Sequence, residues 1–320
     1  MPAQADPDLA LRLARQVADL YGAATERLLR VVASRLARGI DQPGWAEAKL
    51  VEVTALRNDA QKVVAGLQAS TPDAVAAAIQ GGWEAGVRAA QPDITGTLTP
   101  STNTAAVRAL VNETVTQLAG AHTQILRSTV DTYRTVVAQA SALPVTGAGT
   151  RRQAAQQALD RFANQGITGF VDGQGRRWGL DSYAEMATRT ATGRAQVAGT
   201  LDRFQADGRD LVIVSDAPQE CRACRPWEGR VLSISGHDPH YPSLRAAQAA
   251  GLLHATCRHR LGAYIPGLTK RLTDTADPEG DAARREQRRL ERGVRQWKQR
   301  AAAALDDDTR RQCERRARDW

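Results

Sequence analysis

The sequence predicts a mainly α-helical protein with long N-terminal helices and a small α+β domain nearer its C-terminal end. Apolar residues recur every three or four positions through most of the first 165 residues, which is the period of an amphipathic helix. Short β-branched runs bounded by turn residues follow Gly166. Hydrophobic residues make up 42% and aromatic residues only 4%, and alanine supplies much of the former. This balance favours helices packed along narrow seams over a thick sheet sandwich.

The change in character divides the chain into three parts. The length of 320 residues is enough for about two domains with substantial cores. We expect an elongated helical domain over residues 1–165 and a small α+β domain over 166–268. A basic helical tail over 269–320 completes the prediction.

Three helices are expected before residue 91. Apolar residues from Leu9 to Val31 keep one helical face, and Gly39 is a plausible stop. A second helix is expected from Gly44 to about Leu67. The cap-like triplet at 71–73 predicts the start of a third, which Gly81-Gly82 should break.

The strongest periodicity lies between Thr104 and Leu143. Ten residues step by three and four along one face: Val107, Val111, Val115, Leu118, His122, Ile125, Thr129, Tyr133, Val136 and Ala140. Such a heptad-like seam suits a helix of roughly 60 Å. We expect His122 to be a core residue, and we expect the long helices to allow oligomer formation.

Strands and shorter helices are expected after Gly166. Residues 167–171 read as a strand that turns at Asp172-Gly173 and returns through Arg177-Trp178. A helix should open near Ser182 and close at Gly208. A buried strand at 211–214 should pair with 231–234, and a short helix should cover 243–250. A charged helix from Glu279, interrupted at 306–308, should form the tail.

Three of the four cysteines fall in one window and carry the chemistry that the sequence offers. Cys221-x2-Cys224 places two thiols on one loop, and His254-x2-Cys257 follows on a second. These four side chains match a structural, tetrahedral Zn²⁺ site with no open position, and His259 is the alternative fourth ligand. Unmetallated thiols packed under a loop are the other interpretation. A disulfide is disfavoured in a reducing cytoplasm.

Charge and motifs bear on the class of function. The net charge is +8, and residues from Lys270 onward hold 15 basic and 11 acidic side chains, hence half of the excess. These arginines are explained either by solvated helix faces or by a tail that contacts packaged DNA. We find no phosphate-binding loop, nucleophile elbow or His-Glu-x-x-His motif. No stretch reaches the roughly 20 apolar residues that span a bilayer, and we expect no membrane contact.

An ordered set of motifs between Leu180 and Gly262 resembles a known family. A helix carries Arg189-Thr190, a strand leads into Cys221-x2-Cys224, a Trp227-x-Gly229 turn follows, and His254-x2-Cys257-Arg-His259 closes the set. The order is similar to the phage minor capsid proteins of the minor capsid protein 2 type, related to the Mu F-like head-morphogenesis group. Ala255-Thr256 stands where the family more often has Pro-Asn, and this departure leaves the four expected metal ligands in place.

The resemblance implies a structural protein of the phage head and not an enzyme. It implies few copies per virion, contact with the portal protein and the major capsid protein, and a role in head assembly or in DNA packaging and delivery. Arg189 would be a structural anchor. We expect assembly in the host cytoplasm and a final location in the virion. The alternatives are a phage-delivered enzyme, either an ADP-ribosyltransferase-like protein or a nuclease, and a DNA-binding module that uses the arginine-rich tail.

Overall fold

The structure is a computed structural model that describes residues 8–91, 104–145, 149–165, 170–217, 222–270 and 277–320. The chain divides into two compact units. One, here called the sheet unit, comprises Met1–Gln16, Asp73–Val115 and Glu185–Arg284. The other, the helical unit, comprises Val17–Pro72, Thr116–Ala184 and Arg285–Trp320. Each unit draws on residues from both sides of position 165, and the domain boundaries expected from the sequence stay a prediction.

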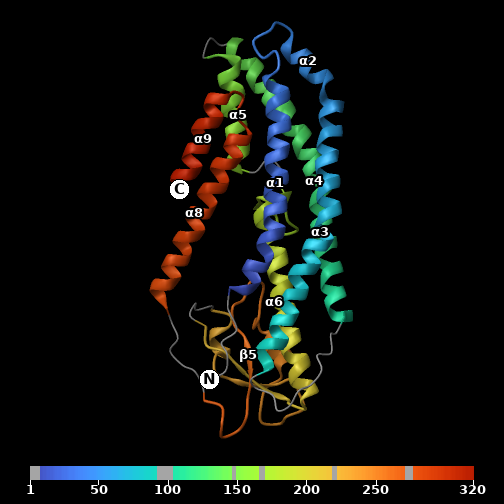
Figure 1. Cartoon of the computed structure of the whole chain (residues 1–320), viewed down its shortest axis with the longest axis vertical. Coiled ribbons are helices and arrows are strands. Elements are labelled where there is room, and N and C mark those ends of the chain that lie inside the picture. The colour runs from blue at the N-terminus through green and yellow to red at the C-terminus, as the bar shows by residue number, and fades with distance from the viewer. Residues whose placement is uncertain (1–7, 92–103, 146–148, 166–169, 218–221, 271–276) are drawn as a thin grey trace. The chain divides into compact units, whose positions relative to one another are not determined.

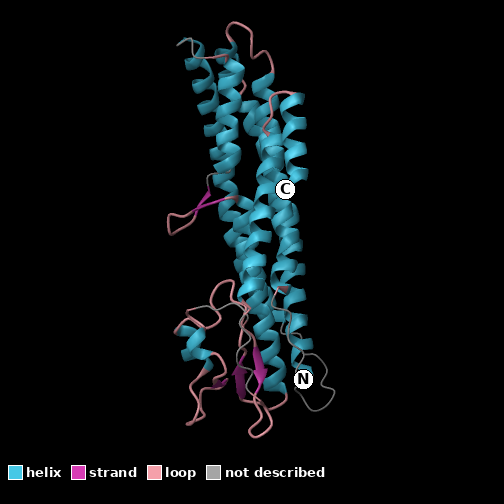
Figure 2. Ribbon diagram, turned by 90° about the vertical axis from the view of Figure 1, so that its left-hand side faces the viewer, coloured by secondary structure: helices cyan, strands magenta, loops and turns pink. Residues whose placement is uncertain are grey.

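Helices dominate both units, as predicted (Figure 1). In chain order they are α1 (Leu9–Ala37), α2 (Trp45–Val51), α3 (Val53–Ala90), α4 (Thr104–Val145), α5 (Arg151–Gln165), α6 (Leu180–Ala206), α7 (Leu244–Ala249), α8 (Pro278–Ala302) and α9 (Asp307–Asp319). The strands are β1 (Phe170–Val171), β2 (Arg177–Trp178), β3 (Leu211–Val214), β4 (Val231–Ser233) and β5 (Leu261–Ala263). Figure 2 shows how little of the described chain is sheet.

The core of the helical unit forms along the predicted seams. The face of α4 predicted from the heptad-like pattern is buried from Leu118 to Ala140. Buried side chains of α1, α3 and α5 also belong to the core of this unit, among them Tyr21, Leu28, Leu29, Leu36, Leu56, Leu67 and Leu159. The ends of α8 and α9 are tied to α5, because Gln156 accepts from the backbone N–H of Leu305 at 2.9 Å and Arg300 donates to Asn164 at 2.8 Å. The β1–β2 hairpin projects to one side of these helices (Figure 2).

The sheet unit is built on three antiparallel strands in the order β4-β3-β5. Val212 lies opposite Leu232 on one side and Ala263 on the other. The central strand was predicted from its apolar run, and its pairing with β4 was predicted too. Its second partner, β5, was not, because Leu261-Gly-Ala263 is too short and too mixed to show a strand pattern. The apolar core under the sheet includes Phe204 of α6 and Leu244 of α7.

One helix prediction was wrong. The triplet Thr71-Pro72-Asp73 does not open a helix, because α3 runs without a break from Val53 to Ala90 with Pro72 inside it. A proline within a helix costs roughly 3 kcal/mol. Buried residues on both sides of Pro72, among them Leu67, Val75 and Ile79, make a continuous apolar face that offsets this cost. Gly81-Gly82 does not break the helix either.

Among the described residues, no helix is both long enough and apolar enough to cross a membrane.

Candidate metal centre

A single helical turn positions the first thiol. Cys224 caps a short 3-10 helix, η2 (Arg225–Trp227), and its carbonyl accepts from the N–H of Trp227 at 2.8 Å. The chain then reverses at Gly229, which has a φ of 66° and donates to the carbonyl of Val214 at 3.0 Å. The hydrogen bond fastens this loop to the end of β3, and Cys224 itself is buried.

His254 and Cys257 lie on a second loop, which leads into β5. Leu253 and Thr256 have left-handed backbones with φ of 57° and 61°, which is a strained conformation for residues with a Cβ. The N–H of Cys257 donates to the carbonyl of His254 at 3.0 Å and closes the turn. Arg189 of α6 donates to the carbonyl of Thr256 at 3.2 Å. This hydrogen bond links the loop to Arg189, the residue expected as a structural anchor.

The two loops bring three metal-binding side chains together. One donor atom each from Cys224, His254 and Cys257 lies within 4.8 Å of the other two. The two sulfur atoms are 3.5 Å apart. A tetrahedral zinc ion with Zn–S bonds of about 2.3 Å separates two sulfur ligands by roughly 3.8 Å, so this spacing fits zinc closely. The Nδ1 of His254 is 2.7 Å from the carbonyl of Ala255 and its protonation there would leave Nε2 for a metal. The group could hold a metal ion.

His259 lies next to Cys257, but it is not one of the three side chains whose donor atoms converge. Its Nδ1 is 3.4 Å from Cys257 Sγ, and its Nε2 is 2.6 Å from a carboxylate oxygen of Glu228. Burial opposes ionisation of both Cys257 and His259. The hydrogen bonds outweigh it, so that the pKa of Cys257 falls to about 7 and the pKa of His259 rises above its usual value. The pair thus favours a thiolate beside a protonated imidazole.

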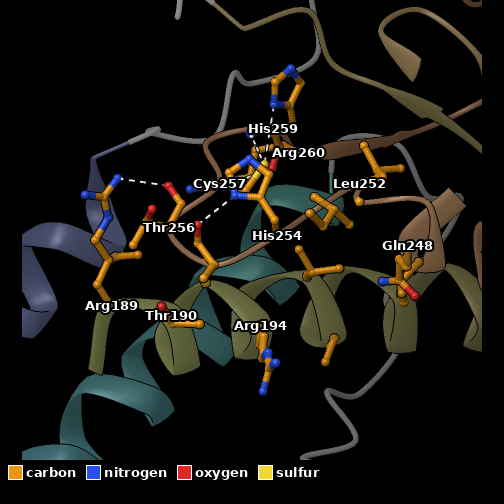
Figure 3. A pocket seen from close by; sticks show the side chains of 18 residues that line it. Arg189, Thr190, Arg194, Gln248, Leu252, His254, Thr256, Cys257, His259 and Arg260 are labelled. Atoms are coloured by element: carbon orange, nitrogen blue, oxygen red, sulfur yellow. Dashed lines mark hydrogen bonds between the residues drawn. The ribbon is translucent and has the colours of Figure 1, made fainter. Parts of the chain in front are cut away.

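A cavity of about 470 Å³ borders the cluster. His254, Cys257 and His259 form part of its wall, and residues of α6 form the opposite wall (Figure 3). Thr190 and Arg194 belong to that opposite wall. One side of the cluster is therefore accessible from the cavity, while Cys224 faces the core.

The structure brings together three of the five residues that the sequence singled out as ligands or alternative ligands. Cys221 lies outside the described residues. His259 lies beside the group and, within the described part of the chain, is hydrogen-bonded to Cys257 among these three residues. Glu228 was missed, and the Trp227-x-Gly229 turn was the signal that could have found it. Cys313, the cysteine outside this window, is a buried free thiol of α9 whose pKa is raised by burial.

Comparison with known families decides what kind of protein carries this site. The family model described as "Phage minor capsid protein 2" matches residues 6–320, which is nearly the whole chain and includes both units. The chain belongs to this family. The resemblance noted on the motifs between Leu180 and Gly262 is therefore confirmed, and this member of the phage minor capsid protein 2 family is a structural phage protein.

A curated relative agrees with the assignment. The chain is 27% identical over 185 residues to a "Structural protein" of Lactococcus phage LL-H, and the match covers 54% of this chain and 50% of the relative. The chain thus aligns with about half the length of that relative. No solved structure matches the chain.

Proposed function

We propose that this minor capsid protein is built into the phage head at the portal or the inner face of the shell. There it would assist head assembly or the packaging and delivery of DNA. The observation that supports the proposal is the family match over residues 6–320. The family and the curated relative are both described as structural, and we propose no enzymatic role.

The test uses the full chain with the portal and major capsid proteins of the same phage. We expect the chain to co-sediment with portal rings or with assembled shells, and to be found by mass spectrometry in purified virions at few copies per particle. Virions that lack the chain, or a folded chain that binds neither component, would contradict the proposal.

We further propose that Cys224, His254 and Cys257 bind a structural zinc ion, with Cys221 as the expected fourth ligand. Thiolate and imidazole are the donors that zinc prefers, and a site of this kind stabilises a small fold by clasping two loops. When bound, the ion would join the η2 loop to the loop before β5. One zinc per chain is expected in protein purified without chelators. Cys224→Ser and Cys257→Ser should lose it, while Cys313→Ser, which alters a thiol outside the cluster, should keep it.

A thiol enzyme is the second function that a specific observation favours. Cys257, His259 and Glu228 align as a nucleophile, a base and an orienting acid would. The proximity of Cys224 to the same sulfur and of His254 to both thiols favours a metal, because a bound ion would block Cys257 as a nucleophile. Alkylation by iodoacetamide separates the two functions. Resistance of Cys257 that disappears on chelation supports the metal, and rapid alkylation of the metal-loaded protein supports the enzyme.

A further inference from the structure

We propose that Glu228 and His259 support the metal centre from behind its ligands, with His259 donating a hydrogen bond to the thiolate of Cys257. The inference rests on the proposed metal centre and assigns two residues to it. In this arrangement Glu228 holds the imidazole by Nε2, and Nδ1 faces Cys257 Sγ. Both are positioning residues, because they act on the metal through the cysteine.

Two pairs of side chains connect the η2 loop to the segment before β5. Cys224 and Glu228 stand at the two ends of η2, so one turn of 3-10 helix separates them. Cys257 and His259 stand two residues apart on the segment that enters β5. Cys224 Sγ lies 3.5 Å from Cys257 Sγ, and Glu228 lies 2.6 Å from His259. The ion would close the first link, and the carboxylate–imidazole hydrogen bond already closes the second.

The segment around His259 is fixed by backbone as well as by side chains. The N–H of Arg260 donates to Ser215 Oγ and the N–H of Ser215 donates to the carbonyl of Arg260, both at 2.9 Å. These bonds extend the β3–β5 pairing to the residue next to His259. The N–H of His259 also donates to Cys257 Sγ at 3.4 Å. Cys257 Sγ therefore accepts one hydrogen bond from the backbone of His259 and lies 3.4 Å from Nδ1 of the same residue, where a second donor would support a metal-bound thiolate.

Direct ligation by His259 fits the geometry less well. The donor atoms that converge within 4.8 Å of one another come from Cys224, His254 and Cys257, and His259 is not among them. Its Nε2 is committed to Glu228, and the side chain is only 1% exposed.

The test measures metal affinity and a spectrum on the full chain. Zinc is competed against a chromophoric chelator, and cobalt replaces zinc for absorption spectroscopy. The variants are His259→Gln, Glu228→Gln and the conservative Glu228→Asp, with His240→Gln as the control, because His240 is an exposed histidine outside the cluster. His259→Gln and Glu228→Gln should keep one metal per chain but bind it about 10- to 100-fold more weakly. Glu228→Asp should recover part of the loss.

The spectrum distinguishes support from ligation and from loss of folding. We expect His259→Gln to shift the sulfur-to-cobalt charge-transfer band, because the thiolate loses a hydrogen bond, while the ligand-field bands of a tetrahedral site stay in place. Altered ligand-field bands would show that His259 is itself a ligand and would overturn the inference. Affinities within twofold of the wild type would also overturn it and leave the metal centre standing. A wild-type protein that binds no metal would overturn both. Circular dichroism checks that each variant folds.

Discussion

At the scale of single residues, we expect a buried polar contact inside the helical unit to make folding sensitive to pH. Tyr21 of α1 shares a hydrogen bond of 2.9 Å with His122 Nε2 of α4, and Thr71 of α3 donates to the tyrosine oxygen at 3.4 Å. The two rings are stacked with centroids 5.9 Å apart. His122 and Tyr21 are both buried. The sequence predicted His122 as a core residue from its place on the α4 seam, but its partner on α1 could not be read from a pattern confined to one helix.

Burial moves the two pKa values in opposite directions. It lowers the pKa of His122 below the ordinary imidazole value and raises the pKa of Tyr21 to about 12. The stability contributed by neutral His122 is therefore present above a pH of about 6.5 and is lost as the pH falls. The contribution of neutral Tyr21 is complete below about pH 10 and is lost as the pH rises towards 12.

His122→Gln should remove part of the acid sensitivity. We expect the free energy of unfolding of the wild type to fall between pH 7.5 and pH 5.5, with a contribution from His122 no steeper than about 1.4 kcal/mol per pH unit. The variant should lose less over that interval, because glutamine does not take up a proton on unfolding. Urea denaturation at the two pH values measures the difference. His237→Gln, an exposed histidine, is the control. Equal acid losses in the wild type and His122→Gln would contradict the prediction.

At the scale of elements, α3 and α6 meet backbone to backbone in the sheet unit. A Cβ on Gly82 would lie 2.6 Å from the carbonyl oxygen of Thr192, and one on Gly86 would collide with the carbonyl of Gln196. A Cβ on Gly199 of α6 would in turn collide with Trp83. The approach lets Thr200 donate across to the carbonyl of Gly86 at 3.1 Å. Gly81-Gly82, which the sequence suggested as a helix break, lies where α3 approaches α6.

Gly86→Ala should therefore destabilise the sheet unit although alanine is the better helix former. Alanine gains up to about 1 kcal/mol of helix propensity, whereas forcing a methyl group into a packed contact costs about 1–3 kcal/mol, and here its neighbour is rigid backbone. Gly193→Ala on α6 is the matched control, because nothing lies within 4 Å of its added Cβ. Thermal unfolding should show a lower melting temperature for Gly86→Ala and an unchanged or higher one for Gly193→Ala. A stabilised Gly86→Ala would show that the helices do not approach so closely.

Periodicity predicted the elements better than it predicted their junctions. The seam of α4 and the apolar run of β3 are strong local signals, and both elements formed as expected. The uninterrupted passage of α3 through Pro72 depends on burial against other helices, which no local pattern reports. The candidate metal centre was likewise predicted only in part. Cys224, His254 and Cys257 were found by their spacing, but Glu228 acquires its role only when the η2 loop meets the segment before β5.

At the scale of the whole molecule, the basic tail is less free to bind than its composition suggests. Many arginines of α8 and α9 are paired with acids on the same helix, as Arg289 is with Glu286 at 2.7 Å. Five exposed cations have no partner among the described residues: Arg292, Lys298, Arg315, Arg316 and Arg318. We propose these as the contacts to packaged DNA that the charge of the tail led us to expect.

Replacing the three exposed arginines of α9 should weaken DNA binding in a salt-dependent way. Each phosphate contact that is lost lowers the slope of log affinity against log salt by about 0.9, so Arg315→Gln, Arg316→Gln and Arg318→Gln together should reduce it by up to about three. Fluorescence anisotropy with duplex DNA of arbitrary sequence, at several salt concentrations, measures the slope. The control replaces Arg30, Arg88 and Arg127, which are exposed on other helices, in the same way. Equal slopes in the two triple variants would exclude the three arginines of α9 as DNA contacts.

The interleaved make-up of the two units has a consequence for synthesis on the ribosome. Each unit is assembled from three separate stretches of chain, and the last of these ends at Arg284 in the sheet unit and at Trp320 in the helical unit. Helix α1 contributes residues to both units. Its neighbours in the helical unit include residues made more than a hundred positions later, such as His122. Contacts between such distant segments form slowly, and neither unit can be completed until most of the chain has been translated. The apolar face of α1 therefore has to wait for partners that are translated much later, and we expect host chaperones to have access to it in that interval.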